Sequence, residues 1–390
     1  MDVDAANSPK DVTDQPLESD AVLLAHRMSR LARKNPHPLD CRTKFYEEEH
    51  RYVLLPPPAP PPPPFLLDDV GHSNHSNNAN DQSEPLDFPL SVTALVHQAF
   101  PSTFDAKAVV DAHLVKWSNN PSSKYFDTIQ ELMLQDGFSL AECGEHIMQS
   151  WNQEGKRARE MGTQMHFELE KWMNRDLDDD KGSEFADCSP CHVDTVKMVS
   201  VAMRGTFYPD MKLVPFRSEF RVFLDAEVSY KGETRRIPIV SGTIDGIFVD
   251  SYERLWIVDW KRIDANKKGR LRLPSSRSSF ATCGVRGFDG FTNCDFLSYS
   301  LQLVLYSLIL ERGNYFPDRE IAGLFLCQVH QESMSQPHFV QAMQGLSHDA
   351  QLKFENAAAA LLDAHTEACI REAEDEMRAS QSRKRSLDEA

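Results

Sequence analysis

Four segments rich in β-branched and aromatic residues, between Phe216 and Trp260, most constrain the fold of this chain. They read FRSEFRVFL, AEVSYKGETRRIPI, VSGTIDGIFV and RLWIVDW, and turn residues separate them. Segments of this composition between turn residues are typical of β-strands, and KGE at 231–233 is the clearest hairpin turn. We therefore expect consecutive strands here.

Helical patterns lie on both sides of these strands. Apolar residues recur at helical spacing in the stretches 91–100, 106–117, 125–134, 139–174, 193–207, 296–311 and 348–377, and 321–330 reads as one further strand. This order predicts an α/β protein in which a central, mixed or mostly antiparallel β-sheet is flanked by helices, with an N-terminal helical layer.

The composition also divides the chain along its length. Residues 1–40 are acidic and polar, which predicts a disordered tail with room for one short helix. Residues 41–55 include FYEEEHRYVLL, a candidate strand or strand pair, and 56–87 form a proline-rich and asparagine-rich linker or insertion. We expect the main domain over 88–365 and a charged tail over 366–390.

The net charge of −17 on its face argues against a polyanionic partner. The acidic residues, however, are concentrated in the first twenty residues, in DLDDDKGSEFAD and in REAEDE, whereas KRIDANKKGRLRLPSSR at 261–277 is strongly basic. A second basic cluster, KRAR, stands at 156–159. These two clusters predict a local positive track on an acidic protein.

The sequence shows neither a membrane-spanning segment nor a recognisable N-terminal targeting signal. It contains no apolar run of membrane-spanning length and no secretory or Arg-rich transit signal at its start. Its eight cysteines are scattered, which favours reduced thiols. We expect a soluble intracellular protein without membrane partners, in the nucleus or cytoplasm rather than the mitochondrion, and not secreted.

The charged residues within the last two strand segments indicate chemistry. Asp245 lies in SGTIDGIFVD, and Asp259 and Lys261 lie in LWIVDWK, where strand alternation points both toward the same side. If the two strands are neighbours, two carboxylates and an ammonium converge, and carboxylates this close usually share a divalent cation. The ordinary alternative is that Asp245 serves a turn and that Asp259 and Lys261 form an ion pair at a strand end.

Four motifs in order favour the first interpretation. They are GTQMHFELE at 162–170, SGTIDGIF at 241–248, WIVDWKR at 256–262 and LQLVLYSLIL at 301–310. With them the chain, over about 88–362, resembles the PD-(D/E)XK nuclease superfamily, specifically the RecB-type exonuclease branch that includes the mitochondrial genome maintenance exonucleases. The resemblance implies a restriction-endonuclease-like core.

The resemblance also assigns roles to individual residues. It implies that His166, Asp245, Asp259 and the main-chain carbonyl of Trp260 hold Mg²⁺ or Mn²⁺, and that Lys261 is the catalytic lysine. Asp245 and Asp259 would thereby be catalytic as well as metal ligands. Further residues would approach nucleic acid: Gln302, Tyr306, Arg262, Lys267, Lys268 and Arg270. Glu170 and Glu219 rank lower, because an orienting role and an exposed strand charge explain them equally well.

We therefore expect a metal-dependent DNA exonuclease that acts on single-stranded or free-ended DNA in replication, repair or recombination. A catalytically inactive DNA-binding scaffold of the same fold is one alternative, and an endonuclease, of mobile-element origin or acting on RNA, is another. The sequence identifies no protein partner.

Two cysteine patterns bear on other cofactors. Only Cys327 and Cys369 follow the helix with Gln302, so the cysteine pattern of cluster-binding relatives is absent and we expect no iron–sulfur cluster. CSPCH at 188–192 matches a c-type haem attachment motif, but it lies in an acidic loop without an export signal. We expect no haem, and a small metal clip is the other reading of this motif.

Overall fold

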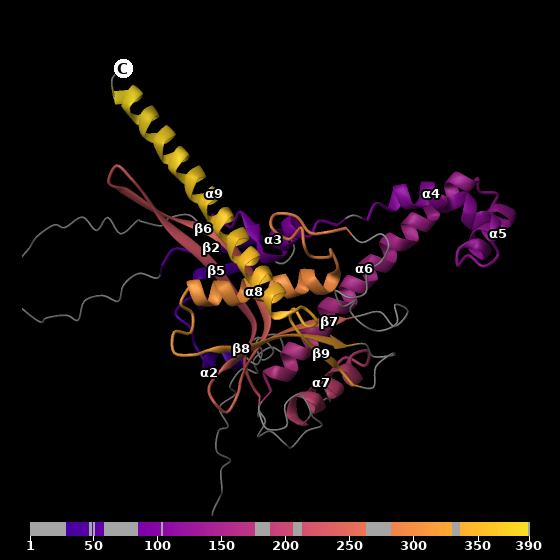
Figure 1. Ribbon diagram of the computed structural model, residues 1–390, viewed down its shortest axis with the longest axis horizontal. Helices are drawn as coiled ribbons and strands as arrows, with labels where there is room; N and C mark the ends of the chain where they lie inside the picture. The colour runs from indigo at the N-terminus through magenta and orange to yellow at the C-terminus, as the bar shows by residue number, and fades with distance from the viewer. Residues whose placement is uncertain are drawn as a thin grey trace, which may run out of the picture.

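The structure is a computed structural model. It describes residues 29–46, 49, 51–57, 85–102, 104–175, 188–205, 213–262, 282–329 and 336–388. Within these residues the protein is a mixed α/β fold, with a mixed β-sheet flanked by helices as the sequence predicts (Figure 1).

A six-stranded mixed sheet forms the centre of the molecule. Its strands are β4 (Leu90–Ser91), β5 (Val214–Tyr230), β6 (Glu233–Val249), β7 (Leu255–Arg262), β8 (Ile321–Val329) and β9 (His338–Gln341). The order is β4-β6-β7-β8-β9, and β5 pairs with β6 outside this path. β6 is antiparallel to β5 and β7, β7 is parallel to β8, and β9, which the sequence pattern did not indicate, is antiparallel to β8.

The hairpin at KGE is confirmed. Tyr230 pairs with Glu233, and the two residues between them, Lys231 and Gly232, have φ values of +49° and +84°. Two positive φ values in a two-residue loop give the turn whose twist matches that of the flanking strands. The predicted segment FRSEFRVFL and the part of AEVSYKGETRRIPI before the turn form one continuous strand, β5, with a shift of register between Leu224 and Asp225.

The helices lie close to their predicted positions. They are α2 (Arg30–Lys34), the 3₁₀ helix η1 (Asp40–Arg42), α3 (Val92–Ala99), α4 (Ala106–Asn119), α5 (Phe126–Gln135), α6 (Leu140–Met173), α7 (Val193–Gly205), α8 (Asp295–Arg312) and α9 (His348–Asp388). The long helix α6 begins with a capping box, in which Ser139 and Glu142 each bind the other's main-chain N–H.

Two hydrophobic clusters cover the two faces of the sheet. One joins the sheet to α3, α8 and α9 and includes Leu95, Leu301 and Leu361, while the other joins it to α7 and the second half of α6 and includes Leu169 and Val199. Alternate residues of β7 serve opposite faces, as strand geometry requires. The active-site candidates of β7 therefore lie on the α8 side.

The predicted helical layer needs a correction. α3 packs on the sheet, but α4, α5 and the first half of α6 project from the body as an arm (Figure 1). The arm has its own small apolar core, formed by Val110, Ile129, Leu132, Cys143 and Ile147. Because these residues bury one another, the arm does not need the sheet to cover its apolar faces.

The N-terminal boundary of the folded region also lies earlier than the predicted residue 41. Leu31 of α2 is only 3% exposed, and the buried guanidinium of Arg217 binds Asp40 at 2.7 Å. Apolar burial and this ion pair hold the segment from Ser29 onward against β5. The candidate strand or strand pair at 41–55 is a pair in the structure, β1 (Thr43–Tyr46) and β2 (Arg51–Leu54), which form a small sheet with β3 (Leu86–Asp87).

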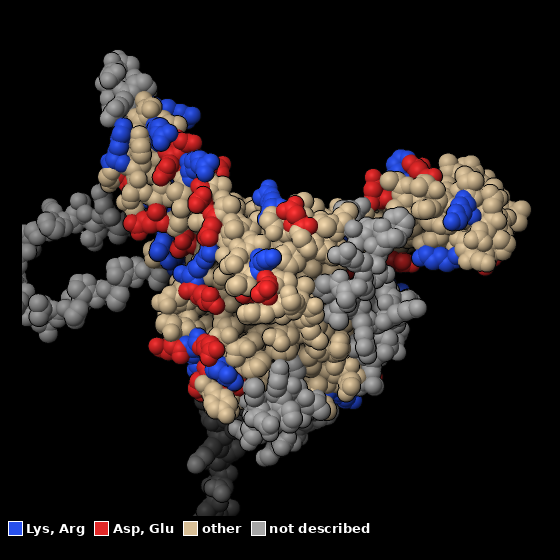
Figure 2. Space-filling model, viewed as in Figure 1, with Lys and Arg blue, Asp and Glu red and all other residues tan. Residues whose placement is uncertain are grey.

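The last helix is longer than predicted. α9 was expected to end near Met377, within the charged tail, but it continues without a break to Asp388. Its outer part meets the β5–β6 hairpin through an ion pair between Arg235 and Glu376 at 3.2 Å. Figure 2 shows acidic and basic side chains gathered along this projecting end. No helix in the described part of the chain has both the length and the apolarity to cross a membrane.

Candidate active site at the β6–β7 edge

The pairing of β6 with β7 brings the three charged residues of the strand motifs together. The Asp245 carboxylate accepts a hydrogen bond from the main-chain N–H of Trp260 at 2.8 Å. The ammonium of Lys261 lies 2.8 Å from Oδ2 and 3.1 Å from Oδ1 of Asp259. Asp259 is only 3% exposed, so this charge pair is withdrawn from solvent.

The second half of α6 carries His166 to the same place. Its Nε2 lies 3.0 Å from the carbonyl oxygen of Trp260, and its Nδ1 lies 3.6 Å from Oδ2 of Asp245. The imidazole thus bridges the helix and the end of β7. The sequence motif at 162–170 predicted a histidine beside the strand aspartates, and the structure places it there.

Glu219 belongs to the centre of the site, although the sequence ranked it low. Its carboxylate lies 3.8 Å from Nδ1 of His166. On β5 it stands opposite Asp245, since the flanking residues pair as Ser218 with Gly246 and Phe220 with Ile244. Its φ of +43° departs from strand geometry, and a non-glycine residue held there costs roughly 1–3 kcal/mol. Such local strain is typical of functional sites.

The group with metal-ligand spacing differs from the expected one. One ligand atom from each of His166, Glu219 and Asp245 lies within 4.8 Å of the others, and this is the one such group among the described residues. Asp259 is paired with Lys261 instead, and its Oδ2 has no hydrogen bond of good geometry. The carbonyl of Trp260 already interacts with His166.

These donors fit a hard divalent cation. Carboxylate oxygens suit Mg²⁺ and Mn²⁺, and an imidazole nitrogen is compatible with Mn²⁺ in particular. Clustered carboxylates and a buried oxygen atom of Asp259 without a well-formed hydrogen bond are also what such a site requires. A protonated His166 is the alternative source of positive charge between the acids.

Burial and mutual repulsion shift the pKa values of these groups. Burial lowers the pKa of His166, but Asp245 and Glu219 outweigh it and raise that pKa to about 9. Burial raises the pKa of Asp259 to about 6, although Lys261 acts in the opposite direction. Burial also raises the pKa of Asp245. Burial and then the charge of Glu219 raise the pKa of Glu170 to about 8. Such shifts are frequent at functional sites.

α8 supports the lysine from the other side. The Lys261 ammonium donates to the side-chain oxygen of Gln302 at 3.4 Å, and Gln302 donates to the hydroxyl of Tyr306 at 3.2 Å. The same ammonium lies 4.3 Å from the ring centre of Tyr299, a cation–π contact. Burial lowers the pKa of Lys261, but Asp259 and Asp245 outweigh it, so the net shift is upward.

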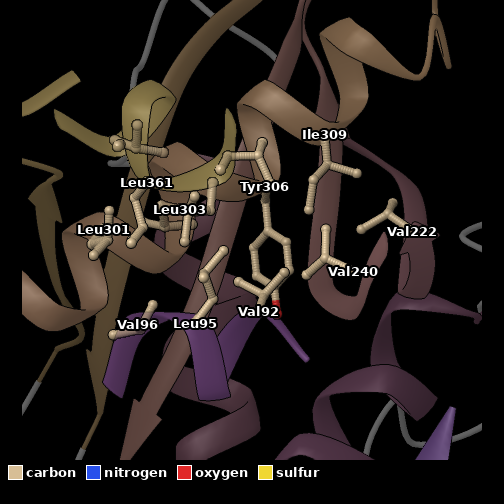
Figure 3. Close-up of a cluster of buried hydrophobic side chains, with 14 of the residues drawn as sticks. Val92, Leu95, Val96, Val222, Val240, Leu301, Leu303, Tyr306, Ile309 and Leu361 are labelled. Atoms are coloured by element: carbon tan, nitrogen blue, oxygen red, sulfur yellow. The ribbon is translucent and has the colours of Figure 1, made fainter. Parts of the chain in front are cut away.

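Tyr306 does not lie where nucleic acid would touch it. It is only 3% exposed, and Figure 3 shows its ring pointing from α8 toward β6 and α3, with Val92 and Val240 beside it. Gly242 permits this approach, since a Cβ at that position would lie 2.7 Å from the ring. The burial of Tyr306 therefore does not fit the predicted direct contact with nucleic acid, and its hydroxyl accepts a hydrogen bond from Gln302 instead.

The predicted basic contacts are only partly described. Arg262 ends β7, where strand alternation turns it away from Lys261. Burial lowers the pKa of His192 near α7, and the charge of Arg262 contributes in the same direction. The structure does not bring it into the cluster. Lys267, Lys268 and Arg270 lie outside the described residues.

Two residues of this site were missed from sequence. Tyr299 precedes Gln302 by three positions and thus shares its helix face, a spacing that could have identified it. Tyr52 of β2 binds Thr243 of β6 at 2.8 Å, and the nearby charges of Glu219 and Asp245 contribute to raising its pKa after burial. No local pattern indicates Tyr52, because the contact depends on the packing of the small sheet.

The CSPCH motif lies directly before α7, which begins at Val193. Cys191 is exposed, Cys188 is half-buried, and burial raises the pKa of the Cys188 thiol to about 11. His192 is buried, and its Nε2 has no hydrogen-bond partner among the described residues. Glu168 of α6 accepts from the main-chain N–H of Ser189 at 3.2 Å. These contacts tie the motif to α6.

No family model matches the chain, and no curated protein matches it. Among solved structures, one described as "Crystal structure of SSO0001" is similar over 53% of this chain and 87% of its own, with 9% identity and a TM-score of 0.18. A score this low supports no inference about fold family or function.

Proposed function

We propose that this protein is a metal-dependent DNA nuclease of the PD-(D/E)XK superfamily, in its RecB-type exonuclease branch, with a restriction-endonuclease-like core. The observation that carries the proposal is the convergence of Asp245, Asp259 and Lys261 on adjacent strands, with His166 from α6 and Gln302 from α8. Single-stranded or free-ended DNA is the proposed substrate, in replication, repair or recombination.

Different residues of the cluster would have different roles in phosphodiester hydrolysis. His166, Asp245 and Glu219 would hold Mg²⁺ or Mn²⁺, with Asp259 beside them. The metal, when bound, would supply Lewis-acid stabilisation of the phosphate and a more acidic water. Because metal binding needs a neutral imidazole, His166 would lose the proton that its raised pKa favours in the metal-free protein.

Lys261 is suited to an electrostatic role. Its raised pKa keeps the ammonium charged at neutral pH, so it can donate hydrogen bonds to a phosphate oxygen or orient the attacking water. Asp259, Gln302 and the ring of Tyr299 fix its direction. Tyr306 holds Gln302 from behind.

The test is a cutting assay on end-labelled single-stranded and duplex DNA with Mg²⁺, Mn²⁺ or chelator. We expect metal-dependent cutting that falls by about 10²–10⁴-fold in Asp259→Asn and Lys261→Met. The matched controls are Asp289→Asn and Lys353→Met, which remove the same charges from exposed positions outside the site. Circular DNA and RNA substrates separate the exonuclease from the endonuclease and RNA alternatives.

A non-cutting DNA-binding scaffold is the second candidate. The observation in its favour is that His166, with its pKa raised to about 9, can balance the clustered carboxylates without a metal. DNA binding without cutting in every metal condition would select this candidate. Cutting in wild type that persists in Asp259→Asn would place the chemistry elsewhere in the chain.

A further inference from the structure

The projecting arm contains a pocket of about 770 Å³. Four aromatic residues from α4, α6 and the adjoining loops line it: Phe104, Trp117, Tyr125 and Trp151. The arm's own apolar core, with Val110 and Ile129, lies next to these rings. The pocket is remote from the β6–β7 cluster, because the arm extends away from the body (Figure 1).

The rings form a fixed but open wall. Tyr125 and Trp117 have centroids 4.6 Å apart, and the indole N–H of Trp151 donates to the Tyr125 hydroxyl at 2.8 Å. Phe104, 5.7 Å from Trp151 by ring centroids, is 65% exposed. An aromatic group held in place with a face toward solvent is suited to stack on a flat ligand.

The charge of the pocket is positive. Its remaining lining includes His113, Lys116 and Lys124 but no carboxylate. The Lys124 ammonium lies 4.5 Å from the ring centre of Tyr125, while Lys116 makes no ion pair within the described residues. Cations at the rim disfavour a quaternary ammonium ligand and favour an anion with a flat aromatic part. A nucleotide has both features.

α6 connects this pocket to the candidate active site. Trp151 lies 15 residues before His166 on the same helix, which corresponds to ~22 Å along its axis. Between them stand the exposed cations Lys156, Arg157 and Arg159, together with Glu154 and Glu160, and Lys156 pairs with Glu160 at 3.8 Å. Cations beside aromatic platforms are the usual means of holding a single strand without reading its sequence.

We infer that the arm pocket is a base-stacking site for one nucleotide of a single-stranded nucleic acid, with Lys116 and Lys124 on its phosphates. The inference rests on the proposed function in one respect: the nucleic-acid strand bound in the pocket is the same one that reaches the β6–β7 cluster. At 3.4 Å for each stacked nucleotide, the ~22 Å between Trp151 and His166 corresponds to about six to seven nucleotides.

Tryptophan fluorescence reads this site directly. Trp117 and Trp151 are partly exposed, whereas the other three tryptophans, Trp172, Trp256 and Trp260, are at most 7% exposed. With chelator present, so that nothing is cut, a 20-nucleotide oligothymidylate should quench the emission of the full chain. An abasic oligomer of the same length should bind more weakly and quench little.

Variants at the rim and wall give the second readout. Phe104→Ala should weaken oligothymidylate binding between about fivefold and a hundredfold, the range for one lost base–aromatic stack. Lys116→Gln and Lys124→Gln should each reduce the slope of log affinity against log salt by about 0.7. Lys107→Gln, an equal charge change on α4 outside the pocket, should leave that slope unchanged.

Several results would overturn the inference. They are no quenching by the oligothymidylate, equal quenching by the abasic oligomer, free thymidylate binding as tightly as the 20-mer, or a Phe104→Ala protein that binds like wild type. Quenching without cutting in the metal-containing assay would refute the proposed nuclease activity but still support base stacking in the arm pocket. Cutting without quenching would refute the pocket and leave the nuclease.

Discussion

The carboxyl of Glu170 offers a direct test of the electrostatics of this cluster. Glu170 follows His166 by one helical turn on α6, and burial together with Glu219 raises its pKa to about 8. In the unfolded chain the same group has a pKa near 4.5. Between these values the folded protein binds more protons than the unfolded chain, so its stability must fall as pH rises.

The magnitude follows from the two pKa values. The Glu170 pKa rises from 4.5 to about 8, and each pKa unit is worth 1.36 kcal/mol. Glu170 therefore contributes at most about 5 kcal/mol to the free energy of unfolding below pH 4.5, and this contribution is lost by pH 8. Asp259 and Asp245, with raised pKa values, act in the same direction. His166 also agrees in sign, since the stability from its raised pKa is lost as pH rises through about 9. The metal-free protein should therefore become steadily less stable from about pH 5 to pH 9.

The assay is urea unfolding in chelator at several pH values for wild type and Glu170→Gln. The neutral glutamine takes up no proton, so the variant should lose less stability than wild type between pH 5 and pH 8. Glu154→Gln is the matched control, because Glu154 is an exposed glutamate of the same helix. Parallel curves for wild type and Glu170→Gln would refute the assignment of a proton to this carboxyl.

Three further outcomes follow from the packing around the site. Gly242→Ala should lower stability by about 1–3 kcal/mol and reduce cutting, because its Cβ would displace the buried ring of Tyr306; equal unfolding midpoints would contradict this. Arg217→Ala should cost about 1.5–3 kcal/mol and expose the segment near Asp40 to protease, which limited proteolysis checks. Glu219→Gly should relieve the strain at φ +43° and so stabilise the metal-free protein. It should also abolish the rise in melting temperature that Mn²⁺ causes, because it removes a proposed metal ligand, and a thermal-shift assay measures both effects.

The sequence was a good guide to the elements and to part of the candidate site. Periodicity located α4, α5, α6 and α8 to within a few residues, because apolar positions in a helix repeat with the helical turn. The same local reasoning placed Asp259 and Lys261 on one face of β7, and the structure confirms that face by their ion pair. The same reasoning could have identified Tyr299, because it lies three residues before Gln302 on one helix face.

Other features were beyond local patterns. Glu219 looked like an exposed strand charge, and its place opposite Asp245 follows from the register of β5 on β6 and from an unusual φ. Tyr306 looked like a surface contact of an apolar helix, but Gly242 lets its ring into the core. Register and close approach depend on pairs of residues distant in the chain, so no single segment contains them.

The sequence by itself thus determined the order of helices and strands and the chemical character of Asp245, Asp259, Lys261 and His166, since these depend on residue type and short-range spacing. Only the tertiary structure decided that Glu219, rather than Asp259, completes the His166 group, and that α4 and α5 form an arm instead of a layer on the sheet. The physical reason is that burial, pKa shifts and metal-ligand distances arise when separate segments exclude water between them, which requires the packed fold.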